Sequence, residues 1–134
     1  MRDYARLQTA VLLRRLAFQV SRTARSGKDA GAIHDLRVAL RRLSRCLRVF
    51  ADFYPDGSWK KVRKELGRLM EVAGKVRDRD VVIALLAEAG AGRHGVVAAR
   101  IEAERKQAAR DLQLEARRWK RSSFSRKWRT ALGL

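Results

Sequence analysis

The chain has 134 residues, of which 46% are hydrophobic, so its length and composition fit one folded domain rather than a disordered chain. Its 32 Lys and Arg residues against 14 Asp and Glu residues give a net charge of +18. A chain this basic is expected to meet a polyanion, such as nucleic acid, polyphosphate or an anionic membrane surface. The single cysteine, Cys46, excludes an intrachain disulfide and fits a reducing compartment.

Nothing in the sequence predicts a membrane-spanning or exported protein. No apolar run approaches the roughly 20 residues that a membrane-spanning helix needs. The first residues, Met1–Arg6, also lack the apolar segment of a secretory signal. We therefore expect a soluble, cytoplasmic protein in which residues 1–134 form a single domain.

The first two helices are predicted from apolar residues that recur at the helical period. A helix is expected over residues 3–25, ended by Ser26 and Gly27. Asp29 is expected to cap a second helix that ends near Phe53. The apolar positions expected to pack in the first helix include Leu7, Val11, Leu12, Ala17 and Phe18.

A turn at residues 54–57 precedes a third helix, which is expected to begin at Ser58 as its cap and to end near Val76. Gly67 and Gly74 lie on one side of this helix, where we expect a neighbouring helix to approach closely. A separate short helix is then expected, capped by Asp78. Its expected core residues are Val81, Val82, Leu85 and Leu86.

A glycine-containing connection over residues 90–95 leads to a long helix over residues 96–120. Ser122 and Ser123 are expected to cap a last short helix whose aromatic residues close the bundle. Since no strand alternation is present, the predicted fold is an all-α antiparallel bundle of four helices with short terminal helices. The apolar residues expected on one side of the long helix are Val97, Ile101, Ala108, Leu112 and Trp119.

The stretch Ile33–Phe50 has two opposite faces when it is read at about 100° per residue. Its apolar face contains Leu36, Leu40, Leu43, Leu47 and Phe50. The opposite face gathers His34, Arg37, Arg41, Arg45 and Arg48. Asp35 is the only acid in the stretch, so these cations have almost no local carboxylate partner.

This helix resembles the signature of the conserved histidine α-helical domain (CHAD) family, an all-helical module associated with inorganic polyphosphate. The resemblance rests on the order His-Asp-Leu-Arg-Val-Ala from His34, followed by the spaced Arg and Leu residues up to Phe50. Leu66–Gly67 and Val76–Val81 resemble two further segments of the family, with Arg79 where the family usually has an apolar residue. The resemblance covers about residues 7–132 and implies a binding module rather than an enzyme, with His34 facing the anion.

If the second and third helices pack as antiparallel neighbours, their cations converge into a groove that suits polyphosphate. Arg donates two hydrogen bonds to phosphate oxygens through its planar fork and keeps its charge. Two opposite unit charges 4 Å apart attract each other by about 1 kcal/mol in water and by about 4 kcal/mol near a protein surface. High affinity for a polyanion therefore needs many such contacts. The predicted polyphosphate-binding residues are His34, Arg37, Arg41, Arg42, Arg45, Arg48, Lys61, Lys64, Arg68 and Lys75.

Other interpretations of the cationic faces stay open. They could be solvated faces without a ligand, or they could bind nucleic acid, although the basic faces carry no aromatic stacking residue among the Arg residues and no helix-turn-helix or RNA-binding signature is present. A phosphate-processing enzyme with His34 as phosphoacceptor would need a metal site or general base that the sequence does not suggest. No catalytic residue, metal or cofactor is therefore expected, and Cys46 is expected to be a small packing residue.

The family commonly carries two copies of a four-helix unit, whereas one histidine motif is found here. His94 is followed by Gly-Val-Val, so it does not begin a second copy. Either the chain is an N-terminal half, or two chains associate as a homodimer that rebuilds the duplicated arrangement. The resemblance also implies localisation to polyphosphate granules.

Overall fold

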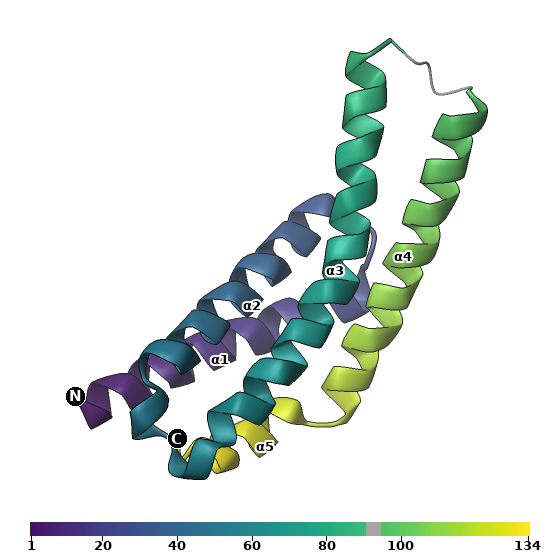
Figure 1. Cartoon of the computed structure of the whole chain (residues 1–134). Coiled ribbons are helices and arrows are strands. Elements are labelled where there is room, and N and C mark those ends of the chain that lie inside the picture. Colours follow the sequence, from purple (N-terminus) through teal and green to yellow (C-terminus); the bar gives the residue numbers. More distant parts are fainter. Residues whose placement is uncertain (91–94) are drawn as a thin grey trace.

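The computed structural model describes residues 1–90 and 95–134. Helices α1 (Arg2–Arg25), α2 (Ala30–Val49), α3 (Ser58–Glu88) and α4 (Val96–Arg121) run up and down as an antiparallel bundle, and α5 (Phe124–Ala131) lies at one end (Figure 1). Each of α1 and α3 packs against both α2 and α4. The described residues contain no strand, so the predicted all-α bundle is confirmed. His94 and the rest of residues 91–94 lie outside the described part.

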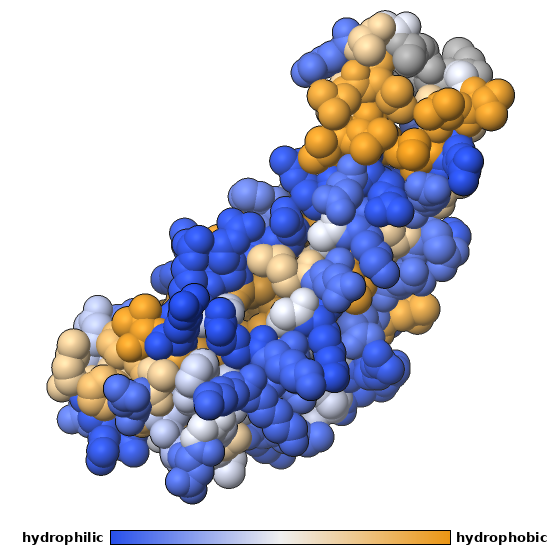
Figure 2. Space-filling view, viewed as in Figure 1, coloured by the Kyte–Doolittle hydropathy of each residue, from blue (hydrophilic) through white to orange (hydrophobic). Residues whose placement is uncertain are grey.

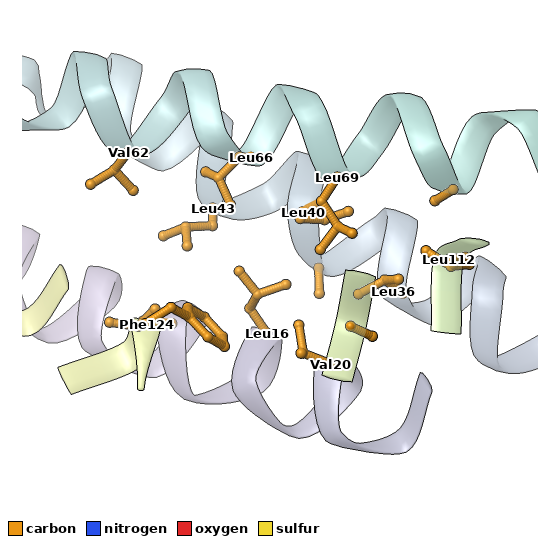
Figure 3. Packing of buried hydrophobic residues seen from close by; sticks show 14 of the residues in the cluster. Leu16, Val20, Leu36, Leu40, Leu43, Val62, Leu66, Leu69, Leu112 and Phe124 are labelled. Atoms are coloured by element: carbon orange, nitrogen blue, oxygen red, sulfur yellow. The ribbon is translucent and has the colours of Figure 1, made fainter. Parts of the chain in front are cut away.

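The core lies between the four long helices, where leucines from each helix interdigitate (Figure 3). The apolar face predicted for α2 is confirmed, because Leu36, Leu40, Leu43 and Leu47 are buried. Phe50, the fifth residue of that face, is half-buried and packs against the core from outside. Burying one such leucine completely is worth about 1.5–3 kcal/mol, so this face contributes much of the stability of the bundle.

Helix α1 carries apolar side chains on two faces, and the predicted set is only partly correct, because Leu12 and Ala17 are half-buried and pack against the core. Leu7 and Phe18 are each 60% exposed. The buried residues of α1 include instead Leu13, Leu16 and Val20. The helical period shows which residues share a face, but two apolar faces on one helix leave open which of them meets the bundle.

Helix α3 has 31 residues and replaces the two helices that the sequence predicts over this range. It continues through Asp78, which therefore caps nothing. The carboxylate of Asp80 accepts a hydrogen bond from Nε of Arg105 in α4 at 2.7 Å, which ties the two long helices together. The expected core residues Val81, Val82 and Leu85 are exposed, because this end of α3 extends past α1 and α2 (Figure 1). Leu86, the fourth of that set, is half-buried.

Of the four predicted helix caps, only the one at Asp29 is confirmed. The Asp29 carboxylate accepts a hydrogen bond from the backbone N–H of Gly31 at 2.9 Å, as expected. The residue before α3 is Gly57, with φ of +70°, and Ser58 makes no capping hydrogen bond. Before α5, Ser123 makes no side-chain cap, and the Ser122 hydroxyl donates to the Trp119 carbonyl instead. Helix α2 ends at Val49 and not near residue 53 as predicted. Two short 3-10 turns, Ala51–Phe53 and Pro55–Gly57, follow it.

The connection between α1 and α2 packs closely against α4. A Cβ atom on Gly27 would lie only 2.7 Å from Cβ of Gln113, so this position requires glycine. Gln113 Nε2 and Arg117 Nε both donate to the carbonyl of Ala24 at 3.1 Å. These bonds satisfy a backbone carbonyl that the end of a helix otherwise leaves without a partner.

The far end of the bundle is closed by aromatic residues, as the sequence predicts. The rings of Trp119, Phe124 and Trp128 lie 5.0–5.3 Å apart between centroids, in tilted and edge-on arrangements. Trp128 Nε1 also donates to the Glu65 carboxylate at 3.2 Å.

Of the residues predicted to line one side of α4, Ala108 and Leu112 are buried, whereas Val97 is exposed. Among the described helices, none has a stretch that is both long and apolar enough to cross a membrane.

Candidate functional site: a basic groove between α2 and α3

The seam between α2 and α3 opens to solvent as two adjoining hollows, of about 300 Å³ and about 510 Å³. Ser44, Arg63 and Gly67 border both hollows, which therefore form one continuous α2–α3 groove. Hydrophilic side chains cover much of both helices around this seam (Figure 2). The charged residues that line the groove are Arg41, Arg45, Arg48, Lys60, Arg63 and Lys64.

The cations of the groove have no carboxylate within ion-pairing distance in the described part of the chain. The ion pairs there use Arg22, Arg79, Arg100, Arg105 and Arg118, none of which lines the groove. Asp35, the one acid of the basic stretch, is bound by Arg22 of α1, with 2.7 Å between the guanidinium nitrogen and the carboxylate oxygen. The positive charge of the groove is therefore left for an external anion.

Helix α2 brings together most of the cations that the sequence assigns to its basic face. Arg41, Arg45 and Arg48 line the groove. His34 and Arg37 precede Arg41 by about two turns and one turn, so they continue the same side of α2 beyond the hollows. His34 is exposed, whereas Arg37 is half-buried and its Nε has no hydrogen-bond partner.

Arg42 is the exception on α2. It lies on the other side of the helix and lines a hollow between α1 and α2, away from the three groove arginines. Consecutive residues of a helix are rotated by about 100°, so Arg41 and Arg42 face different neighbours.

Helix α3 contributes only one of the four cations that the sequence predicts for it. Lys64 borders the groove, but Lys61 lines a hollow next to α5 and Arg68 lines one next to α4. Lys75 is exposed and borders none of the described hollows. Lys61, Arg68 and Lys75 recur every seven residues and form one stripe, and α3 turns this stripe away from α2.

Arg63 and Lys60 are the two charged groove residues that the sequence reasoning missed, and Arg63 borders both hollows. Its Nε donates to the hydroxyl of Ser44 on α2 at 3.1 Å, which fixes the guanidinium across the seam and leaves its other N–H groups free of any protein acceptor in the described part. Its spacing of four residues from Gly67 puts both on one side of α3. The sequence alone does not show that this side of α3 faces α2, and so it does not identify Arg63 as a groove residue.

Gly67 leaves one wall of the groove without a side chain. The prediction that Gly67 and Gly74 allow a close helix approach is wrong, because a Cβ atom on either residue would meet no atom within 4 Å. At Gly67 the missing side chain instead exposes the backbone of α3 to the groove. An extended ligand can therefore lie close to the helix at this point.

A small polar cluster is buried behind α2. The hydroxyl groups of Thr9 and Tyr54 lie 2.6 Å apart, and Sγ of Cys46 lies 3.6 Å from the Thr9 oxygen. Burial raises the pKa of the Tyr54 phenol far above its ordinary value. Cys46 is only 8% exposed, which agrees with the expected packing role. Within the described residues, no three side chains of the types that bind metals gather in one place.

The helices and their unpaired cations define a small all-α bundle protein with one strongly basic groove. The sequence profile of the CHAD domain family matches residues 8–133, which is nearly the whole chain. The chain therefore belongs to the CHAD domain family. Searches of curated proteins and of solved structures found no match.

Proposed function

We propose that this chain is a binding module for inorganic polyphosphate, not an enzyme, and that the ligand lies in the α2–α3 groove. One observation carries the proposal. Arg41, Arg45 and Arg48 of α2 and Arg63 of α3 converge on a single groove, and no carboxylate neutralises them in the described structure. Membership of the CHAD family adds support, since the family is associated with polyphosphate.

The spacing of the arginines suits a linear polyanion. Successive groove arginines on α2 are three or four residues apart, which places their Cβ atoms about 5–6 Å from each other along the helix. A ligand with a negative charge at every unit can contact several of them at once, and each guanidinium can donate two hydrogen bonds. Polyphosphate also has no sugar or base to fit into a narrow groove.

On this proposal the protein works in the cytoplasm and collects at polyphosphate granules. Its role there is to bind, and His34 is a further phosphate donor at the end of the row of cations. A neutral imidazole donates one hydrogen bond to phosphate, and a protonated one adds charge.

Nucleic acid is a second candidate ligand because of one aromatic residue. Trp59 borders the same groove beside Lys60, whose ammonium lies 5.7 Å from the centre of the ring, and beside Arg63. The basic face of α2 has no aromatic residue among its arginines, but the fold brings Trp59 of α3 to the same groove. A base of a single-stranded nucleic acid can stack on such a ring, and stacking is worth about 1–3 kcal/mol per base.

The test is a competition experiment on the purified chain. Labelled long-chain polyphosphate is displaced by unlabelled polyphosphate, duplex DNA or single-stranded RNA at equal charge concentration, with a salt titration for each. Polyphosphate is expected to compete at least tenfold better than either nucleic acid, a difference of about 1.4 kcal/mol or more. Equal competition with one common salt dependence would overturn the proposal.

Variants locate the site and separate the two candidates. Arg41→Ala with Arg45→Ala should weaken polyphosphate binding about tenfold or more, at about 1.4 kcal/mol per factor of ten. A matched control removes the same charge from α5 through Arg126→Ala with Arg129→Ala, both exposed and outside the groove, and should have little effect. Trp59→Ala should leave polyphosphate binding unchanged. The nucleic-acid candidate would be favoured if the parent chain binds RNA better than polyphosphate and Trp59→Ala loses RNA binding.

A further inference from the structure

The free ends of α3 and α4 form an apolar surface that no other described residue covers. Both helices extend beyond α1 and α2, and apolar side chains gather at this end (Figures 1 and 2). Single exposed apolar residues are ordinary, but a contiguous group marks an interaction site. Val96 is 88% exposed, Val97 61% and Leu85 57%. We call this surface the hairpin tip, made of Val81, Val82, Leu85, Val96 and Val97.

The hairpin tip differs from the rest of the molecule in charge. Residues 81–104 contain three glutamates and two arginines, so this segment has a net charge of −1 while the whole chain has +18. Arg100 is also paired with Glu104, at 3.8 Å between its Nε and a carboxylate oxygen. A polyanion is therefore attracted to the body of the bundle and not to the tip.

A second apolar surface lies on the opposite pair of helices. The seam between α1 and α2 holds a hollow of about 580 Å³, which we call the α1–α2 groove. Phe18, 60% exposed, stands at this groove, and Asp35 at its edge is already bound by Arg22. Its apolar lining consists of Val11, Leu12, Phe18, Val38 and Ala39, and the cations beside them are Arg14, Arg15 and Arg42.

We propose that the hairpin tip of one chain binds in the α1–α2 groove of a second copy, and that the reciprocal contact closes a twofold symmetric dimer. The tip projects and the groove is hollow, and both are apolar. Glu88 and Glu102 flank the tip on α3 and α4, whereas three arginines flank the groove. Apolar character and charge are thus complementary between the two surfaces.

The two other ways to pair identical copies fit the charges less well. Groove against groove brings the arginines of both copies together in one interface and is repulsive. Tip against tip places like-charged glutamates near each other and leaves both α1–α2 grooves exposed. Reciprocal binding covers two tips and two grooves, whereas each alternative leaves two of these apolar surfaces exposed. The proposal is independent of the ligand of the α2–α3 groove.

The experiment is analytical ultracentrifugation of the full chain without polyphosphate, at physiological salt and over a range of concentrations. The parent chain is expected to be a dimer. Leu85→Lys in the tip and Phe18→Lys in the α1–α2 groove should each raise the dissociation constant at least tenfold. Leu114→Lys is the matched control, because Leu114 is 60% exposed on α4 outside both surfaces and its replacement should leave the dimer intact.

Mixing the two monomeric variants tests which surfaces meet. The Phe18→Lys chain keeps its tip and the Leu85→Lys chain keeps its α1–α2 groove, so together they can form one of the two contacts and should give a heterodimer. Val97→Lys and Arg15→Glu probe the same two surfaces through other exposed side chains, with circular dichroism to confirm the fold. Polyphosphate binding per chain should change by no more than a few-fold in any of them, because none of the changed residues lines the α2–α3 groove.

Three results would overturn the proposal. The first is a parent chain that stays monomeric at every concentration. The second is a dimer that Leu85→Lys disrupts and Phe18→Lys does not, which is the result for tip-against-tip pairing. The third is the absence of a heterodimer when the two monomeric variants are mixed.

Discussion

The two grooves beside α2 contain similar numbers of arginines and differ in what lies between them. In the α2–α3 groove the cations come from both helices, and Gly67 leaves the wall open. In the α1–α2 groove the arginines stand beside an apolar lining that includes Phe18 and Val38. The first suits a hydrophilic polyanion and the second an apolar partner with acidic edges. A count of basic residues therefore says little about a site until the neighbouring helix is known.

One basic helix serves both grooves because its side chains point in all directions. Arg41 and Arg42 are adjacent in sequence and belong to different grooves. The rotation of about 100° between them is enough to separate a ligand-facing cation from one at an apolar surface. Three predictions test this difference, from the largest expected effect to the smallest.

The largest effect is expected on stability, where a buried residue beneath the α2–α3 groove is compared with an exposed residue of the α1–α2 groove. Leu40 lines the α2–α3 groove from below and is 1% exposed, so Leu40→Ala should lower the free energy of unfolding by about 2–5 kcal/mol. Phe18→Ala in the α1–α2 groove should change it by less than about 0.5 kcal/mol, because that side chain is largely exposed. Urea unfolding followed by circular dichroism measures both. Equal losses would mean that Phe18 packs against the bundle.

Charge reversal is expected to have the next largest effect, on polyphosphate affinity. Arg41→Glu with Arg63→Glu places two negative charges in the α2–α3 groove and should weaken binding about 100-fold, or about 2.7 kcal/mol. Arg42→Glu with Arg15→Glu makes the same change of charge in the α1–α2 groove, and salt-screened repulsion alone should weaken binding only a few-fold. Fluorescence titration with labelled polyphosphate distinguishes the two. If both pairs weaken binding equally, the ligand responds to net charge and not to a groove.

The smallest effect is expected from filling the open wall. Gly67→Leu should reduce polyphosphate affinity by about tenfold, or about 1.4 kcal/mol, because the new side chain occupies the α2–α3 groove. The same change should raise helix stability by up to about 1 kcal/mol, since glycine is a poor helix former and no neighbour obstructs the new Cβ atom. Thermal unfolding and the binding titration should therefore change in opposite directions. Gly67→Ala, which fills less space, is the control.

Much of the fold can be predicted from the sequence because helical periodicity is a local property. The apolar face of α2, the Asp29 cap and the all-α bundle were predicted and are confirmed. The family can also be recognised from the His34 motif, since a dozen positions of one helix carry it. These features depend on residues within a few turns of each other, which is the range over which a sequence pattern has direct physical meaning.

The candidate site was predicted mainly for the α2 side, and on α3 the prediction identified Lys64 alone among the residues that border the groove. The row from Arg41 to Arg48 follows from the period of one helix, and the structure brings it together in the groove. Arg63 and Trp59 join that row only because of the angle at which α3 meets α2. Lys61 and Arg68 face α5 and α4 for the same reason.

The sequence by itself determined which residues share a face of each helix, where most helices begin and end, and that one of them presents unpaired cations. The tertiary structure decided which of two apolar faces of α1 is buried, that α3 continues through Asp78 to Glu88, and which cations of α3 face α2. The physical reason is that the backbone period relates side chains within one helix, whereas the rotation of a helix about its axis is set by packing against all its neighbours at once.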